Sequence, residues 1–132
     1  MMKSSRLYHM VLAGVLCAVG IVVPMFMPRI VLGPMSFTLA SHVAVFLGMF
    51  ISPAVAVAVC IGTTLGFFLT TPAIIALRAA SHIVFAGLGA LYLKKHPDTI
   101  DRPVASTVFN FVIALLHAAA EMIVVAPFFL SG

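Results

Sequence analysis

Charged residues are scarce in this sequence, which holds only 3 acidic and 7 basic side chains among its 132 residues. Charged residues make up 8% of the chain and hydrophobic residues 64%, whereas a soluble domain is about a quarter charged and about half apolar. A small folded chain leaves much of its surface in water, so a soluble domain could not hide this apolar fraction. The composition therefore predicts an integral membrane protein whose apolar surface contacts lipid.

The sequence also lacks the motifs of several enzyme classes. It has no nucleophile elbow, no phosphate-binding glycine loop, no CxxC pair and no HExxH motif, each of which carries a defined chemistry. Its two cysteines, Cys17 and Cys60, both lie in apolar segments, where a buried thiol is more common than a disulfide or a metal pair. We therefore expect neither enzymatic activity nor a cofactor.

The basic residues give a topology. A net charge of +4 and a pI near 9.6 would suggest a nucleic-acid partner in a soluble protein, but Lys and Arg of membrane proteins collect in cytoplasmic segments. Lys3 and Arg6 precede the first apolar segment, and Lys94, Lys95 and Arg102 lie in "KKHPDTIDRP", the one plainly soluble loop. We predict that the N-terminus and this loop are cytoplasmic and that no nucleic acid is bound.

Five apolar segments, separated mostly by proline-containing turns, predict membrane-spanning helices. They run over residues 7–23, 38–51, 54–69, 73–93 and 104–126. Between the first two, "PMFMPRIVLGPMSF" holds three prolines and Arg29, which predicts an apolar outer loop that folds back onto the protein as a cover. No repeat and no linker occurs, so we expect residues 1–132 to form one all-α transmembrane bundle.

Polar side chains inside the predicted helices indicate a functional site, because they are costly in a membrane. Arg78 and His82 are four residues apart and share a helix face, as do His117 and Glu121. At 1.5 Å per residue, these two pairs lie at about the same depth below the outer ends of two antiparallel helices. His42 lies at a similar depth in the second helix. The spacing predicts one polar layer in the outer half of the membrane.

Two interpretations of this layer stay open. Arg78 and Glu121 could form a buried ion pair that only orients two helices, although such a pair is weak evidence for a role in stability. The favoured interpretation is a pocket open to the outside, in which Arg78 binds an anionic ligand. Phe85 lies on the same helix face as Arg78 and would stack on a flat ring.

A metal site is a third interpretation. His117-x-x-x-Glu121 has the spacing at which two side chains can share one ion. The pattern contains only two residues and arises easily by chance, and it would place Arg78 beside a cation. We therefore expect no metal.

Small residues line the first predicted helix, at Ala13-x-x-x-Cys17 and Gly14-x-x-x-Ala18. Small residues four apart let two helix backbones approach closely. This helix offers almost no polar group to the predicted pocket, so its small-residue surface is the better candidate for contact with a partner protein.

The order of these features resembles the substrate-binding S-component of energy-coupling factor (ECF) vitamin transporters, and in particular its niacin-type subgroup. The similar stretches are "MPRIVLGPMSFTLASH", "MFISPAVAVAVCIGTTLGFFL" and "ALRAASHIVFAGLGALYLKK", and the resemblance covers residues 7–127. It implies a six-helix protein that binds a vitamin on the outer side, under the loop after the first helix. It also implies a T-component partner, contacted through the first helix, and two ATPase subunits that hydrolyse ATP.

For a nicotinate-like vitamin, the resemblance implies roles for the polar layer. Arg78 would hold the carboxylate with its two-pronged guanidinium, His82 or His117 would hydrogen-bond the ring nitrogen, and Glu121 would orient one of these groups. The sequence predicts five helices where six are expected, so we expect that the last helix is missing. An S-component for another vitamin, a ligand-free structural or assembly protein and, less favoured, a channel remain as alternatives.

Overall fold

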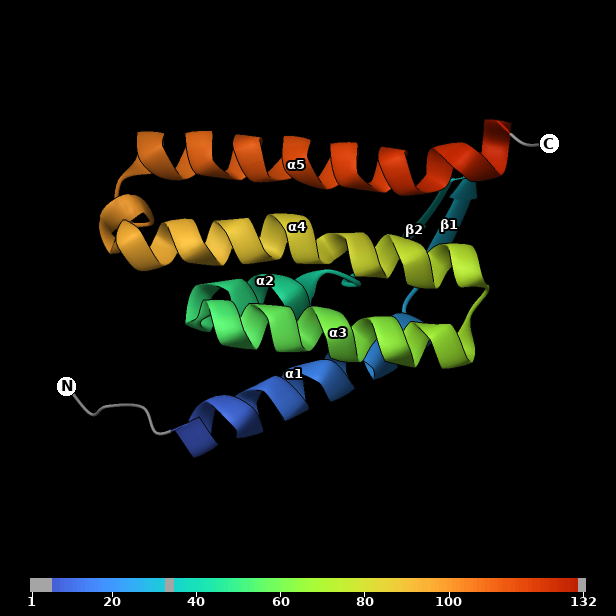
Figure 1. Cartoon of the computed structure of the whole chain (residues 1–132), viewed down its shortest axis with the longest axis horizontal. Coiled ribbons are helices and arrows are strands. Elements are labelled where there is room, and N and C mark those ends of the chain that lie inside the picture. Colours follow the sequence, from blue (N-terminus) through green and yellow to red (C-terminus); the bar gives the residue numbers. More distant parts are fainter. Residues whose placement is uncertain (1–5, 33–34, 131–132) are drawn as a thin grey trace.

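A computed structural model describes residues 6–32 and 35–130. Its helices are α1 (Arg6–Phe26), α2 (Val43–Ile51), α3 (Pro53–Thr70), α4 (Ala73–Lys95) and α5 (Pro103–Leu130), with a short 3-10 helix η1 (Pro97–Thr99). Two short strands, β1 (Arg29–Leu32) and β2 (Met35–Thr38), follow α1. The prediction of an almost entirely helical bundle is confirmed (Figure 1).

Four of these helices, α1, α3, α4 and α5, are long and apolar enough to cross a membrane. The fifth, α2, has 9 residues and extends about 13 Å at 1.5 Å per residue, which is less than half of the roughly 30 Å hydrocarbon layer. Large apolar side chains such as Met10, Phe111 and Ile123 are exposed on the outer helices, where lipid would cover them. The protein is a multi-pass membrane protein.

The segment between α1 and α2 differs in detail from the expected loop. Pro24 lies inside α1 and does not end it, and the helix continues to Phe26. The chain then forms an antiparallel hairpin in which Arg29 lies opposite Thr38. A turn with Ala40 at a positive φ of 62° follows, so α2 begins at Val43 and not at Thr38.

The C-terminal helix is also longer than expected. Pro127 lies within α5, which continues to Leu130 and does not end at residue 126.

The core lies around α3 and α4, which pack against each other. Helices α1 and α2 pack on α3, and α5 packs along α4 (Figure 1). Small residues permit the closest approach, because a Cβ at Gly62 would overlap the thiol of Cys17, and one at Gly66 would overlap Ile21. The small-residue spacing of α3 therefore serves internal packing.

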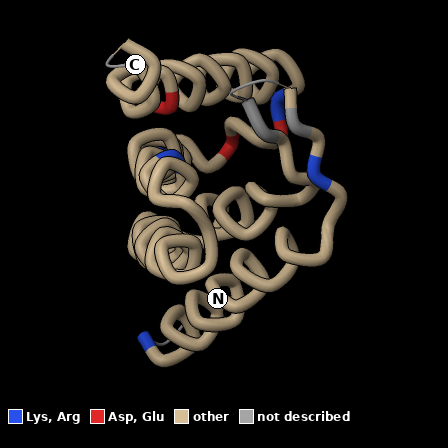
Figure 2. The backbone as a smooth tube through the Cα atoms, turned by 90° about the vertical axis from the view of Figure 1, so that its right-hand side faces the viewer, with Lys and Arg blue, Asp and Glu red and all other residues tan. Residues whose placement is uncertain are grey.

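The two ends of the bundle are formed by different segments of the chain. The start of α1, the turn at Ser52 and the loop between α4 and α5 lie at one end, and the hairpin, the α3–α4 turn and the end of α5 lie at the other (Figure 1). Few Lys, Arg, Asp or Glu residues interrupt the helices (Figure 2). Arg6, at the start of α1, and the basic residues around the α4–α5 loop thus lie at one end, opposite the hairpin, whereas Lys3 lies outside the described residues.

Candidate functional site

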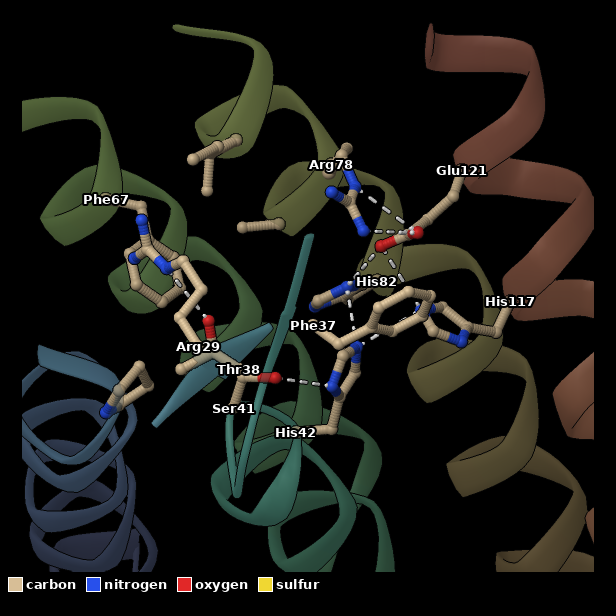
Figure 3. A pocket seen from close by; sticks show the side chains of 13 residues that line it. Arg29, Phe37, Thr38, Ser41, His42, Phe67, Arg78, His82, His117 and Glu121 are labelled. Atoms are coloured by element: carbon tan, nitrogen blue, oxygen red, sulfur yellow. Dashed lines mark hydrogen bonds and ion pairs between the residues drawn. The ribbon is translucent and has the colours of Figure 1, made fainter. Parts of the chain in front are cut away.

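A cavity of about 180 Å³ lies at the hairpin end of the bundle, where the hairpin, the turn before α2, and helices α3, α4 and α5 meet (Figure 3). Its polar lining consists of Arg29, Thr38, Ser41, His42, Arg78, His82, His117 and Glu121. Its apolar lining consists of Pro24, Phe37, Phe67, Ile75 and Ala79. All five polar residues of the predicted layer therefore line one cavity.

Glu121 occupies the centre of the polar lining. Its Oε2 accepts hydrogen bonds from Nη2 and Nε of Arg78 at 3.1 and 3.3 Å. Its Oε1 lies 3.4 Å from Nε2 of His82 and 3.4 Å from Nε2 of His117. One carboxylate oxygen thus faces the guanidinium and the other faces two imidazoles.

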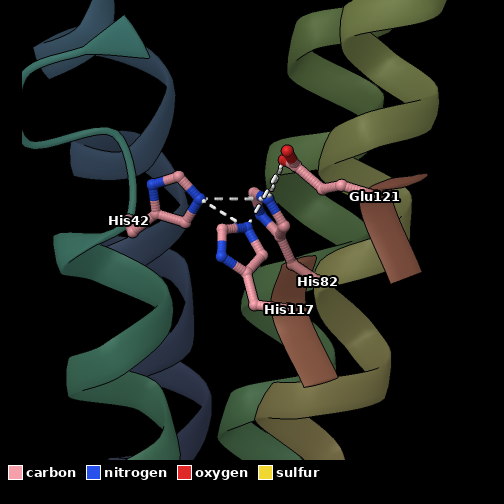
Figure 4. Close-up of side chains that lie close together, drawn as sticks. All are labelled: His42, His82, His117 and Glu121. Atoms are coloured by element: carbon pink, nitrogen blue, oxygen red, sulfur yellow. Dashed lines mark hydrogen bonds and ion pairs between the residues drawn. The ribbon is translucent and has the colours of Figure 1, made fainter. Parts of the chain in front are cut away.

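The third imidazole completes a compact cluster. Nε2 of His42 lies 3.2 Å from Nε2 of His82 and 3.2 Å from Nε2 of His117 (Figure 4). On the opposite side of its ring, Nδ1 of His42 lies 2.8 Å from the hydroxyl oxygen of Ser41. Three imidazole nitrogens and one carboxylate oxygen converge within 4.8 Å of one another.

Local sequence explains how these side chains meet. The pairs Arg78–His82 and His117–Glu121 each share a helix face because their members are four residues apart. Helices α4 and α5 are antiparallel neighbours joined by a short loop, and His82 and His117 are about equally far from that loop along the chain. His42 is the N-cap residue of α2, so it sits where the chain turns beneath the hairpin.

Phe85 supports the cluster and does not line the cavity. It is fully buried, and its ring centroid lies 4.9 Å from that of His117 and 5.6 Å from that of His82. The aromatic residues that do line the cavity are Phe37 on β2 and Phe67 on α3. A ring in the cavity would therefore meet these two side chains and not Phe85.

Arg29 is a cavity residue that the sequence presented only as part of the cover. It lies on β1, and its Nε donates a hydrogen bond to Oγ1 of Thr38, its cross-strand neighbour, at 3.2 Å. It forms no ion pair with any of the residues that the structure describes. The sequence feature that could have singled out Arg29 is that it is the one cation in the proline-rich segment.

The small residues of α1 divide between two environments. Ala13 is buried, and Cys17 packs against Gly62 with its thiol 3.6 Å from the carbonyl oxygen of Ala58. Gly14 and Ala18 are exposed, and a Cβ at Gly14 would meet nothing within 4 Å. Of the four residues predicted to contact a partner protein, Gly14 and Ala18 are therefore the two that lie on the surface.

The chain is 41% identical, over 132 aligned residues, to the niacin transporter NiaX of Lactococcus lactis subsp. cremoris (strain MG1363). The match covers 98% of this chain. Nearly the whole chain is thus similar in sequence to a niacin transporter. It spans about 60% of the length of that relative. No family model matches the chain, and no solved structure matches it significantly.

The match bears out the niacin-type resemblance in the sequence. The match covers nearly the whole chain, so the aligned region includes the hairpin and the helices that line the cavity. The relative is named as a transporter, which agrees with the expectation of a transport subunit and not an enzyme.

Proposed function

We propose that this chain is the substrate-binding subunit of an ECF-type vitamin uptake transporter and that it binds nicotinate or a similar small aromatic anion. The observation that carries this proposal is the charge of the cavity. Its described lining holds two guanidinium groups, on Arg29 and Arg78, and one carboxylate, on Glu121. With the histidines neutral, one positive charge remains for an anion, and electrostatic complementarity favours a carboxylate ligand.

The lining also suits the shape of the vitamin. The planar guanidinium of arginine matches a carboxylate, with two parallel N–H donors. Phe37 and Phe67 offer flat apolar surfaces against which a pyridine ring can stack. A ligand held in this way would have its carboxylate between Arg29 and Arg78 and its ring nitrogen near His82 or His117.

The size of the cavity favours a one-ring ligand. At about 180 Å³, it is smaller than the roughly 300–1,000 Å³ of pockets that hold drug-sized molecules. The hairpin forms one wall of this cavity.

The proposal is tested by isothermal titration calorimetry, in which nicotinate is added to the detergent-purified chain. We expect saturable binding of one molecule per chain with a dissociation constant in the nanomolar to micromolar range. Absence of binding at millimolar nicotinate would remove the proposal. Mass spectrometry of small molecules that co-purify with the chain would identify a different vitamin.

A ligand-free structural role is the second candidate, and the Arg78–Glu121 ion pair at 3.1 Å favours it. In that case the two side chains serve only to hold α4 against α5. The two candidates differ in one measurement, because a purely structural pair predicts no change in stability when nicotinate is added, whereas a bound vitamin stabilises the folded chain.

For the orientation and partners, we propose that the N-terminus and the α4–α5 loop are cytoplasmic, which places the cavity on the outer side. A T-component would pack on α1, and two ATPase subunits bound to it would hydrolyse ATP. This placement rests on the basic residues at one end and on the exposed small residues of α1.

Replacing Gly14 and Ala18 together by leucine is expected to block assembly with the T-component and to leave nicotinate binding unchanged. Both positions are exposed on α1, and large side chains there would keep a partner helix at a distance. Co-purification with a tagged T-component measures the effect. Ala118→Leu, at an exposed position of α5, is the control and should assemble normally. Equal recovery of both variants would exclude this surface.

A further inference from the structure

Four atoms in the cavity that can bind a metal lie close together, and four of the six distances between them match the edges of a tetrahedral zinc site. The contacts from Nε2 of His42 to the other two Nε2 atoms are both 3.2 Å, and those from Oε1 of Glu121 to His82 and His117 are both 3.4 Å. A tetrahedral zinc ion binds nitrogen and oxygen at about 2.0–2.1 Å, which puts neighbouring ligand atoms roughly 3.3–3.4 Å apart. All four atoms lie within 4.8 Å of one another.

From this arrangement we propose that His42, His82, His117 and Glu121 bind one divalent transition-metal ion, and that Zn²⁺ fits the site best. Imidazole nitrogens suit zinc, copper, iron and nickel. Three imidazoles and one carboxylate supply four ligand atoms, the number that zinc binds in structural sites, where its geometry is tetrahedral. The site includes no thiolate, because Cys17 and Cys60 lie elsewhere in the core.

The bonding capacity of the cluster supports a cation at its centre. A neutral imidazole carries one N–H and one lone pair, so three Nε2 atoms that face one another cannot all donate and accept at once. One cation at their centre uses the lone pair of every imidazole and of the carboxylate together. Among the described residues, hydrogen bonds also give every buried side-chain nitrogen and oxygen a partner, so a cation would replace these contacts.

The hydroxyl of Ser41 is compatible with the form of His42 that a metal requires. It lies 2.8 Å from Nδ1, where it can accept the proton of that nitrogen and leave the lone pair of Nε2 directed at the cluster (Figure 4). Histidines that bind metals commonly have the second ring nitrogen hydrogen-bonded in this way, which fixes the tautomer and the ring orientation.

Arg78 does not oppose a cation here, although its charge argued against a metal in the sequence. Its guanidinium binds Oε2 of Glu121, whereas the imidazoles approach Oε1. The carboxylate thus separates the two positive groups, and Arg78 is a positioning residue that orients a ligand oxygen. Carboxylate ligands in metal sites are generally held by such hydrogen bonds.

A metal here would link three parts of the fold. Its ligands come from the turn before α2, from α4 and from α5, and α5 is the least buried of the four long helices. With four protein ligands, the ion would have a structural role. It would also occupy the Nε2 atoms near the vitamin's ring nitrogen, which leaves Arg29, Arg78 and the phenylalanines to hold the vitamin.

Metal binding is tested on the purified full chain, stripped with a chelator and then dialysed against Zn²⁺ in the absence of nicotinate. We expect one zinc per chain by elemental mass spectrometry. Replacing zinc with Co²⁺ should give the intense visible absorption of a tetrahedral cobalt site. Wild-type protein that retains no zinc above the level of the dialysis buffer would overturn the proposal.

Variants identify the ligands. His42→Ala, His82→Ala and His117→Ala should each lose the stoichiometric zinc and the tetrahedral cobalt spectrum, while His96→Ala, at the opposite end of α4, should keep both. Arg78→Ala should bind zinc about 10–100-fold more weakly, the usual effect of losing a hydrogen bond to a ligand. Zinc retained by all three cluster variants would place the metal elsewhere. Glu121→Gln keeps the shape of the side chain and therefore serves as a control for misfolding of the other variants. It should show an altered cobalt spectrum.

The proposal stands apart from the vitamin proposal because each has its own measurement. Zinc binding without nicotinate binding supports the metal site and removes the proposed transport substrate. Nicotinate binding by a chain that never holds zinc removes the metal site alone.

Discussion

Arg78→Ala is expected to weaken nicotinate binding by about 10- to 100-fold, because a hydrogen bond to a charged group contributes about 1.5–3 kcal/mol and each 1.4 kcal/mol is a factor of ten. Arg78 lines the cavity and points toward Glu121 (Figure 3), so a carboxylate ligand would share its guanidinium. Binding of the uncharged amide, nicotinamide, should change much less, since it carries no negative charge. Titration calorimetry gives, for each compound, the ratio of the wild-type affinity to the variant affinity.

The matched control is Arg102→Ala. Arg102 is an exposed cation at the opposite end of the molecule, 3.6 Å from Asp98, and its removal should leave both affinities unchanged. Nicotinate affinity that is equal in wild type and in Arg78→Ala would rule out a role for this guanidinium. A loss of affinity for nicotinate and nicotinamide by the same factor would show that the cavity had collapsed and would count against charge recognition.

Glu121→Ala is expected to destabilise the fold by about 2–4 kcal/mol in chelator-treated protein. Loss of one member of a fully buried ion pair costs about 3–5 kcal/mol, because the remaining charge stays buried without its partner. The expected value is lower here, since about 20% of the Arg78 side chain is exposed. The variant also removes the oxygen that faces His82 and His117. Unfolding of the detergent-solubilised protein measures the change in free energy.

A double variant separates the charge effect from simple loss of packing. Arg78→Leu/Glu121→Leu removes both charges, and replacing a buried pair by apolar residues is often close to neutral, so it should recover most of the stability. Asp98→Ala, which breaks an exposed pair in the α4–α5 loop, should change the stability by less than about 1 kcal/mol. A double variant as unstable as the sum of its single variants would contradict this account.

Much of the candidate site could be predicted from the sequence because helices convert sequence spacing into geometry. Arg78 and His82 had to share a face, and antiparallel neighbours had to bring them level with His117 and Glu121. The spacing did not specify which atoms meet. The division of Glu121 between a guanidinium on one oxygen and two imidazoles on the other depends on how α4 and α5 are rotated about their axes.

The hairpin was the least predictable element. The three prolines of the segment after α1 indicated an irregular cover, and only the structure shows paired strands that bring Arg29 and Phe37 to the cavity. Phe85 was placed on the correct helix face but lies beneath the histidines, because the depth of a side chain in the core depends on what packs against it.

By itself, the sequence determined that this is a membrane protein of packed helices, that turns lie near Ser52 and Thr71 and between α4 and α5, and that its few polar side chains share one layer. These properties follow from composition, proline placement and helix periodicity, which are local. Tertiary structure alone decided that atoms of His42, far away in the chain, lie within 4.8 Å of those of His82, His117 and Glu121. Contacts between distant segments depend on the packing of the whole bundle, which no local pattern encodes.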